Sequence, residues 1–70
     1  MASDGSVVGR VGSLTVATRG ADGSGEVLVQ VRGGSEAYLA WSTDPLPKGT
    51  AVLVVDLRGA RAVDVVPWIS

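Results

Sequence analysis

The chain has 70 residues, with seven acidic residues against six basic ones and a formal net charge of −1 at pH 7. It contains no cysteine and no histidine, which excludes disulfides, thiolate nucleophiles, the usual zinc ligand sets and the most common general base. We therefore expect one small domain that is not an enzyme and that binds no cofactor or metal ion.

Valine dominates the apolar residues, and β-branched side chains fit a pleated sheet better than a helix. No segment approaches the ~20 apolar residues of a membrane-spanning helix, and the N-terminus lacks the features of a secretory signal. The sequence as given therefore predicts a soluble β domain. Residues 1–6 are small and polar and are expected to be a disordered leader, so that the folded domain covers residues 7–69.

The first predicted strand covers residues 7–18, which are mostly apolar or small. Its glycines, Gly9 and Gly12, indicate a bend or a bulge where the chain turns a corner. Residues 20–25 form a concentrated turn signal, because glycine and aspartate tolerate the backbone angles of tight connections.

The second predicted strand, residues 26–32, has a valine at every other position, which places the valines on one face of the sheet. These valines are Val27, Val29 and Val31, and we expect them to face the core. The pair Gly33-Gly34 predicts a hairpin turn into a third strand, residues 36–42.

Residues 43–50 contain two prolines and form the long connection, with no room for an ordinary helix. A nearly continuous apolar strand follows at residues 51–57, and Arg58-Gly59 predicts a tight turn into the last strand, residues 61–67. Five short strands fit a barrel better than a sandwich, which ordinarily has about seven. The predicted fold is therefore all-β, a five-stranded small barrel of the oligonucleotide/oligosaccharide-binding (OB-fold) type.

The spacing of several short motifs is similar to that of the soluble C-terminal domain of the NfeD-like proteins. These motifs are Gly9-x-x-Gly12, Gly25-Glu26-Val27, the run Leu46-Pro47-Lys48-Gly49-Thr50-x-Val52-x-Val54-Val55, and Val63-x-Val65-x-Pro67. The turn Pro47-Lys48-Gly49-Thr50 with its alternating valines is the most distinctive of them.

This resemblance implies an OB barrel attached behind transmembrane helices and encoded beside stomatin- or flotillin-like (SPFH) membrane scaffold proteins, with which it assembles. The parent protein would be anchored in the membrane only through flanking helices that this sequence lacks, with the domain on the cytoplasmic side. A second departure from the family is the glycine-rich turn at residues 20–25. Some larger relatives carry a serine protease domain, and no such segment is present in this sequence.

We predict a partner-binding surface from the alternation of side chains along the strands. If Tyr38, Ala40 and Ser42 point inward, then the large apolar residues that point outward are Trp41, Leu39, Leu28 and Leu53. Exposed together, they would form an interaction surface for an SPFH-family protein or for another copy of the chain. The alternative is that a bulge or a two-sided core hides them.

Two further groups of residues have simpler interpretations. Trp68 and Ile69 are expected to close the open end of the barrel as a lid, with an exposed apolar tail as the alternative. The charged residues around the last hairpin are expected to form a solvated rim without a specific function. They are Asp56, Arg58, Arg61 and Asp64.

The alternative function is weak binding of single-stranded nucleic acid, which OB barrels achieve with aromatic platforms flanked by cations. Tyr38 and Trp41 could stack on bases, but three positions apart in a strand they point to opposite faces. The negative net charge and the absence of a basic stripe also disfavour this function.

Overall fold

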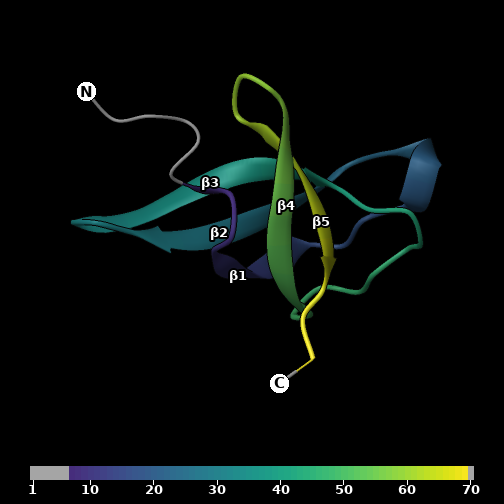
Figure 1. Cartoon of the computed structure of the whole chain (residues 1–70). Helices are drawn as coiled ribbons and strands as arrows, with labels where there is room; N and C mark the ends of the chain where they lie inside the picture. Colours follow the sequence, from purple (N-terminus) through teal and green to yellow (C-terminus); the bar gives the residue numbers. More distant parts are fainter. Residues whose placement is uncertain (1–6, 70) are drawn as a thin grey trace.

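The computed structural model describes residues 7–69, which form five strands and one short 3-10 helix (Figure 1). In chain order these elements are β1 (Val11–Val16), η2 (Gly20–Asp22), β2 (Gly25–Val31), β3 (Gly34–Trp41), β4 (Ala51–Gly59) and β5 (Ala62–Pro67). The predicted leader, residues 1–6, lies outside the described part of the chain. No helix within residues 7–69 is long and apolar enough to cross a bilayer.

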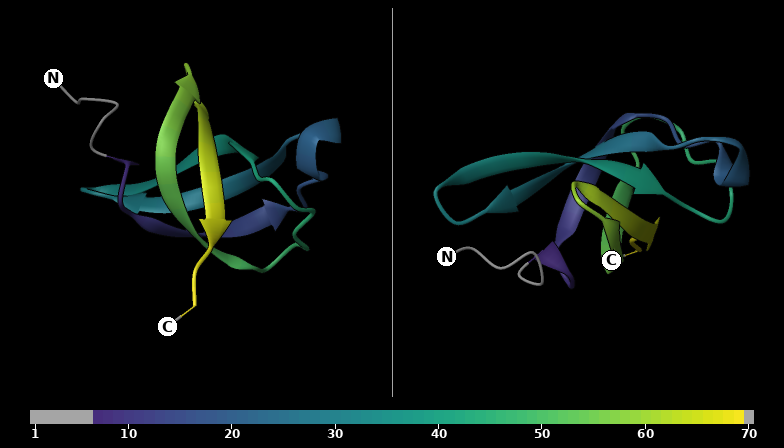
Figure 2. Two further views of the ribbon diagram at one scale, coloured as in Figure 1. Left: turned by 45° about the vertical axis from the view of Figure 1, so that its right-hand side comes forward. Right: turned by 90° about the horizontal axis from the view of Figure 1, so that it is seen from above.

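The five strands close into a barrel in the order β1-β2-β3-β5-β4. Neighbouring strands are antiparallel except β3 and β5, which run parallel and pair from Leu39 with Ala62 to Trp41 with Asp64. Figure 2 shows the β4–β5 hairpin crossing the β2–β3 hairpin, so that the two hairpins enclose the interior. This arrangement is the Greek-key barrel of the OB-fold, and the predicted fold class is confirmed.

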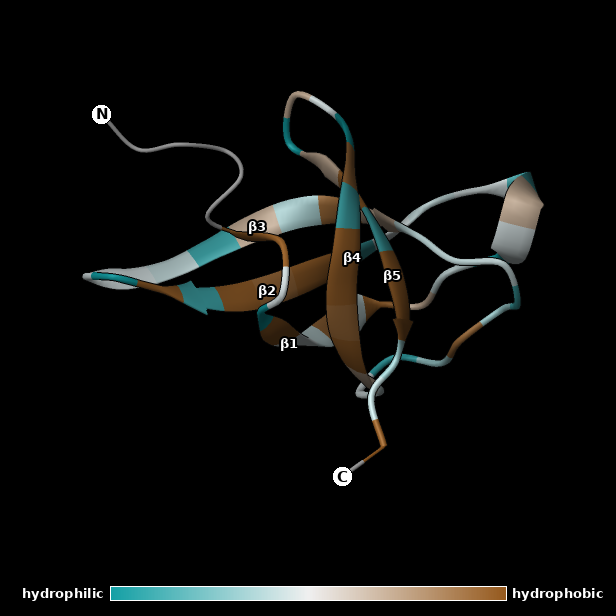
Figure 3. Ribbon diagram, in the orientation of Figure 1, coloured by the Kyte–Doolittle hydropathy of each residue, from teal (hydrophilic) through white to brown (hydrophobic). Residues whose placement is uncertain are grey.

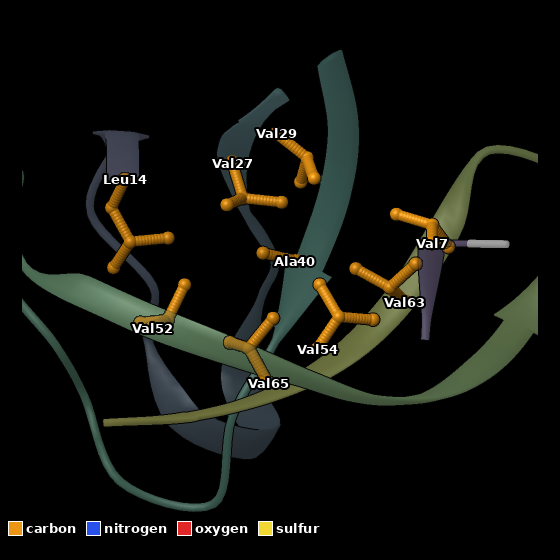
Figure 4. Packing of buried hydrophobic residues seen from close by; sticks show 9 residues of the cluster. All are labelled: Val7, Leu14, Val27, Val29, Ala40, Val52, Val54, Val63 and Val65. Atoms are coloured by element: carbon orange, nitrogen blue, oxygen red, sulfur yellow. The ribbon is translucent and has the colours of Figure 1, made fainter. Parts of the chain in front are cut away.

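The core consists almost entirely of valine, as the alternating pattern predicts. All its side chains are at most 2% exposed and come from every strand and from the segment before β1 (Figure 4). They are Val7, Leu14, Val27, Val29, Ala40, Val52, Val54, Val63 and Val65. Since strands alternate their side chains between two faces, each strand contributes one or two residues to the interior and leaves the residues between them on the outside.

The first strand is shorter than predicted, because the chain turns at Val8 and Gly9 and β1 begins only at Val11. Gly9 has a φ of +92°, which a residue with a β-carbon rarely adopts. Its N–H donates to the Val54 carbonyl (2.8 Å), and this bond holds the segment against β4. Val7 is consequently tucked into the core beside Val54 and Val63 (Figure 4).

Gly12 does not form the predicted bulge. Its lack of a β-carbon instead lets β1 pack closely against β2. A β-carbon on Gly12 would lie 2.7 Å from the Leu28 carbonyl oxygen and 2.8 Å from a methyl group of Val27. The bulge itself falls between Leu14 and Val16, where the register with β2 shifts. Gly12 therefore leaves room for the core valines of β2, and the strand bends at the bulge between Leu14 and Val16.

The two hairpin turns each lie one or two residues from their predicted positions. Arg32 and Gly33 form the first turn, and Ala60 and Arg61, rather than Arg58-Gly59, form the second. Arg61 has a φ of +61°, a conformation that costs a residue other than glycine roughly 1 kcal/mol. Its guanidinium donates to the Ala37 carbonyl (2.8 Å), a contact across to β3 that offsets this strain.

Thr18 joins the loop after β1 to the loop after β3. It is a polar side chain that is only 2% exposed. Its Oγ1 accepts a hydrogen bond from the Leu46 N–H (2.8 Å) and lies within hydrogen-bond distance of the Ser42 hydroxyl (2.6 Å). Its own N–H donates to the Leu46 carbonyl (2.9 Å). The long connection is therefore fixed to the barrel although it has no secondary structure of its own.

We expect Thr18→Val to destabilise the fold by about 1 to 3 kcal/mol, because an isosteric methyl group leaves the partly buried Leu46 N–H without its acceptor. Denaturant unfolding would measure the change in the free energy of unfolding. Thr18→Ser is the matched control, since it keeps the hydroxyl. Equal losses in both variants would show that the hydroxyl group does not hold the connection.

Candidate protein-interaction surface

The four residues predicted to bind a partner all lie outside the core. Ala40 is fully buried, so the predicted inward phase of β3 is correct. Leu28 and Leu39 are 42% and 49% exposed, while Trp41 and Leu53 are half-buried. The structure therefore leaves all four side chains accessible, at least in part, from the outer surface of the barrel.

The barrel does not bring these four residues into one patch. Leu28 and Leu39 lie on neighbouring strands, two residues apart in the β2–β3 register. Leu53 lies on β4, where it pairs with Val11 of β1 and Val66 of β5. Strand β1 separates it from β2. Sequence alternation gave the direction of each side chain, but the closure of the sheet decides which of them are neighbours.

Trp41 stands at the centre of a small cluster that the sequence did not reveal. The Arg58 guanidinium carbon lies 4.8 Å from the centroid of the indole ring, within the range of a cation–π contact. Arg58 Nε donates to Asp64 Oδ1 at 2.8 Å, and Asp64 pairs with Trp41 in the β3–β5 register. Two members of the predicted rim of solvated charges therefore orient an aromatic side chain.

A surface cleft of about 510 Å³ opens beside this cluster. Its apolar walls are Trp41, Val55 and Val66, of which the two valines are 43% and 40% exposed. The other lining residues come from η2, from the end of β3 and from the last hairpin. They are Gly20, Ala21, Ser42, Thr43, Arg58, Asp64 and Val65. Apolar walls with a few polar groups at the margin are typical of binding clefts, and this one has room for one or two side chains.

Tyr38 and its arginine lie apart from this cleft. The Arg61 guanidinium carbon is 5.0 Å from the centroid of the phenol ring, and Arg61 Nη1 donates to Glu36 Oε1 at 2.8 Å. Tyr38 also packs against the core. Each aromatic residue of β3 is thus covered by an arginine that is itself paired with a carboxylate, which leaves little ring surface or unpaired positive charge for stacking on nucleic-acid bases.

The two apolar residues at the C-terminal end do not form the predicted lid. Trp68 is 44% exposed and Ile69 is 87% exposed, so neither belongs to the core. The N–H of Trp68 donates to the Ala51 carbonyl (2.9 Å), which continues the β4–β5 pairing beyond the end of β5.

A second apolar surface, which the sequence indicated only through Leu53, crosses three strands. We call it the β1–β4–β5 face. It consists of two outward rows, Val11–Leu53–Val66 and Ser13–Ala51–Trp68. Figure 3 shows hydrophobic residues continuing along β4 and the second half of β5. None of the six side chains is charged.

The buried polar side chains of residues 7–69 have their hydrogen-bond partners within the fold. Within residues 7–69 no group of three or more histidine, cysteine, aspartate or glutamate side chains could hold a metal ion. No buried side-chain nitrogen or oxygen in that range lacks a hydrogen-bond partner. The polar groups that the fold buries are thus used to hold the fold itself.

The distinctive turn in the sequence has a definite structural part. Thr50 N–H donates to the Pro47 carbonyl (3.2 Å), and Gly49 between them has a φ of +92°, the geometry of a turn that favours glycine at its third position. The Gly49 N–H donates to the Leu14 carbonyl (2.8 Å) and the Leu14 N–H donates to the Thr50 carbonyl (3.0 Å). The turn therefore extends the hydrogen bonding between β1 and the start of β4.

Comparison with known proteins agrees with this reading of the motifs. The model of the NfeD C-terminal domain family matches residues 11–66. The solution structure of the soluble domain of the NfeD protein YuaF from Bacillus subtilis is 36% identical in sequence, with a TM-score of 0.70. The match covers 84% of this chain and 70% of that one. No curated protein matches the chain. The chain belongs to the NfeD C-terminal domain family.

Proposed function

We propose that this domain is a non-catalytic protein-interaction module that supports assembly with a stomatin- or flotillin-like membrane scaffold protein. The observation that carries the proposal is the cleft beside Trp41, where an indole ring and two exposed valines meet on the outside of a closed barrel. Clefts of this kind accept apolar side chains of a partner, and tryptophan is among the residues that contribute most to binding energy. Membership of the NfeD family supports the choice of partner.

The same proposal places the domain in a larger, membrane-anchored protein, on the cytoplasmic side. Within the docking surface Trp41 is the main contact, and Leu39, two residues earlier on the same strand, extends it toward Leu28 of β2. Arg58 and Asp64 form the polar margin of the cleft. A partner segment with an apolar side chain flanked by polar groups matches this arrangement.

We expect Trp41→Ala to weaken binding of the scaffold protein by about 30-fold or more, since a central aromatic contact contributes at least about 2 kcal/mol. The fold should persist, because Trp41 is not part of the core. Titration calorimetry with a purified stomatin- or flotillin-like domain would measure Kd, and circular dichroism would check the fold.

Val16→Ala is the matched control, because Val16 is 50% exposed and does not line the cleft. Its Kd should equal that of the unmodified chain. Equal binding by the Trp41→Ala variant would contradict the proposed docking surface. A parallel titration with a single-stranded oligonucleotide tests for nucleic-acid binding, since binding through phosphates would weaken steeply as the salt concentration is raised.

A further inference from the structure

The β1–β4–β5 face adjoins the proposed docking cleft at Val66, which belongs to both, and is itself unusual for a small monomer. It has an uncharged centre at Leu53, with Val11 and Val66 on either side, 39% and 40% exposed, and Trp68 in the next row at 44%. Contiguous apolar surface of this kind marks interaction sites. The charges around the face indicate what covers it.

One cation and one anion at the two ends of β4 take part in no ion pair within the described residues. Lys48 lies in the turn before the strand, and Asp56 lies near its far end, on the outward side in register with Asp64. Asp64 has its own cation in Arg58, while the Asp56 carboxylate accepts only the N–H of Leu57 (2.8 Å). The unpaired charges of this strand are thus positive before Leu53 and negative after it.

Two copies of this strand that run in opposite directions have complementary charges, because the positive end of each lies beside the negative end of the other. In a two-fold symmetric contact the same patch faces its own copy, so β4 of one copy runs antiparallel to β4 of the other. Lys48 of each copy then approaches Asp56 of the other, while the two Leu53 side chains meet near the axis. Two twisted sheets can pack face to face in this way, with their apolar rows interleaved.

We infer that the chain associates with a second copy of itself through the β1–β4–β5 face, as a two-fold dimer centred on Leu53 with reciprocal Lys48–Asp56 contacts. The six residues of the face are far fewer than the 20 to 30 per partner in a stable interface, so the dimer has a Kd of roughly 0.1 to 1 mM. Anchoring in one membrane, as in the proposed function, would raise the effective concentration of the copies.

The test is sedimentation equilibrium of the full chain from about 10 μM to about 2 mM, which spans the Kd of a weak interface. We expect the weight-average mass to rise toward that of a dimer. Leu53→Glu should raise Kd by at least about tenfold, because it places two like charges at the axis. Val16→Glu is the control, since Val16 is 50% exposed and belongs neither to this face nor to the cleft.

Charge reversal distinguishes this dimer from other modes of association. Lys48→Glu and Asp56→Lys should each weaken it by about three- to tenfold, and the double variant should restore it, because the reciprocal contacts are re-formed with opposite sign. A chain that stays monomeric at about 2 mM overturns the inference. So does association that is insensitive to Leu53→Glu, or a double variant no better than the single ones. Trp41→Ala should leave the dimer unchanged, which separates this face from the cleft.

Discussion

Leu14→Ala is expected to destabilise the domain by about 2 to 5 kcal/mol. Leu14 is 2% exposed and is the largest side chain in a core built otherwise of valine and one alanine. Figure 4 shows it beside Val27 and Val52, which come from the two strands that flank β1. Valines are stiff about their first side-chain torsion, so they cannot swing into the cavity that the truncation leaves.

The loss would be a large share of the total, since a domain of this length has about 4 to 10 kcal/mol of stability in all. Thermal unfolding followed by circular dichroism should show a fall in Tm of about 10 °C or more. Leu39→Ala removes the same atoms from a side chain that is 49% exposed, and it should change stability by about 0.5 kcal/mol or less. Similar losses for the two variants would contradict the assignment of inner and outer faces.

Gly25→Ala is expected to destabilise the domain by about 3 kcal/mol, because a β-carbon there has no space. It would lie 2.6 Å from the Ala17 carbonyl oxygen and closer still to that of Val16. Both are backbone atoms at the end of β1 and in the loop after it, and they cannot rotate away as a side chain would. Chemical denaturation would give the difference in the free energy of unfolding.

Gly33→Ala separates this steric effect from the general effect of replacing a glycine. Gly33 has a φ of +86° but no atom within 4 Å of its β-carbon position, so only backbone strain of about 1 kcal/mol applies. If Gly25→Ala lowers the free energy of unfolding no more than Gly33→Ala does, β2 does not pack tightly against the end of β1 at Gly25.

Local patterns in the sequence are sufficient to predict the strands and the direction of their side chains. Alternate valines at Val27 and Val29 can serve only one face of a sheet, and both are fully buried. The apolar, β-branched side chain of Val7 predicts a place in a strand. Its actual place follows from the Gly9 N–H bond to Val54, a partner far along the chain that no local pattern specifies.

The features that the sequence did not predict all depend on contacts between segments that are distant along the chain. Arg61 occupies a turn position that usually favours glycine, and its contact with the Ala37 carbonyl accounts for this only once β3 is seen beside the last hairpin. The contact of Arg58 with Trp41 likewise follows from the pairing of β3 with β5, which places Asp64 and its partner Arg58 beside Trp41. Residue types alone predicted a solvated rim, whereas the closed sheet turns that rim into one side of a cleft.

The parallel pairing of β3 with β5 also governs how the domain can form. Leu39 and Ala62 are 23 residues apart in sequence, and bringing such segments together carries a loop-closure entropy before any contact compensates for it. β5 is the last strand to leave the ribosome, and it must enter between β3 and β4. Small β barrels dominated by such non-local pairings fold in about milliseconds to seconds. Until β5 has been synthesised and has paired, the hairpin of β2 and β3 therefore carries an unpaired edge that a nascent-chain chaperone would be able to shield.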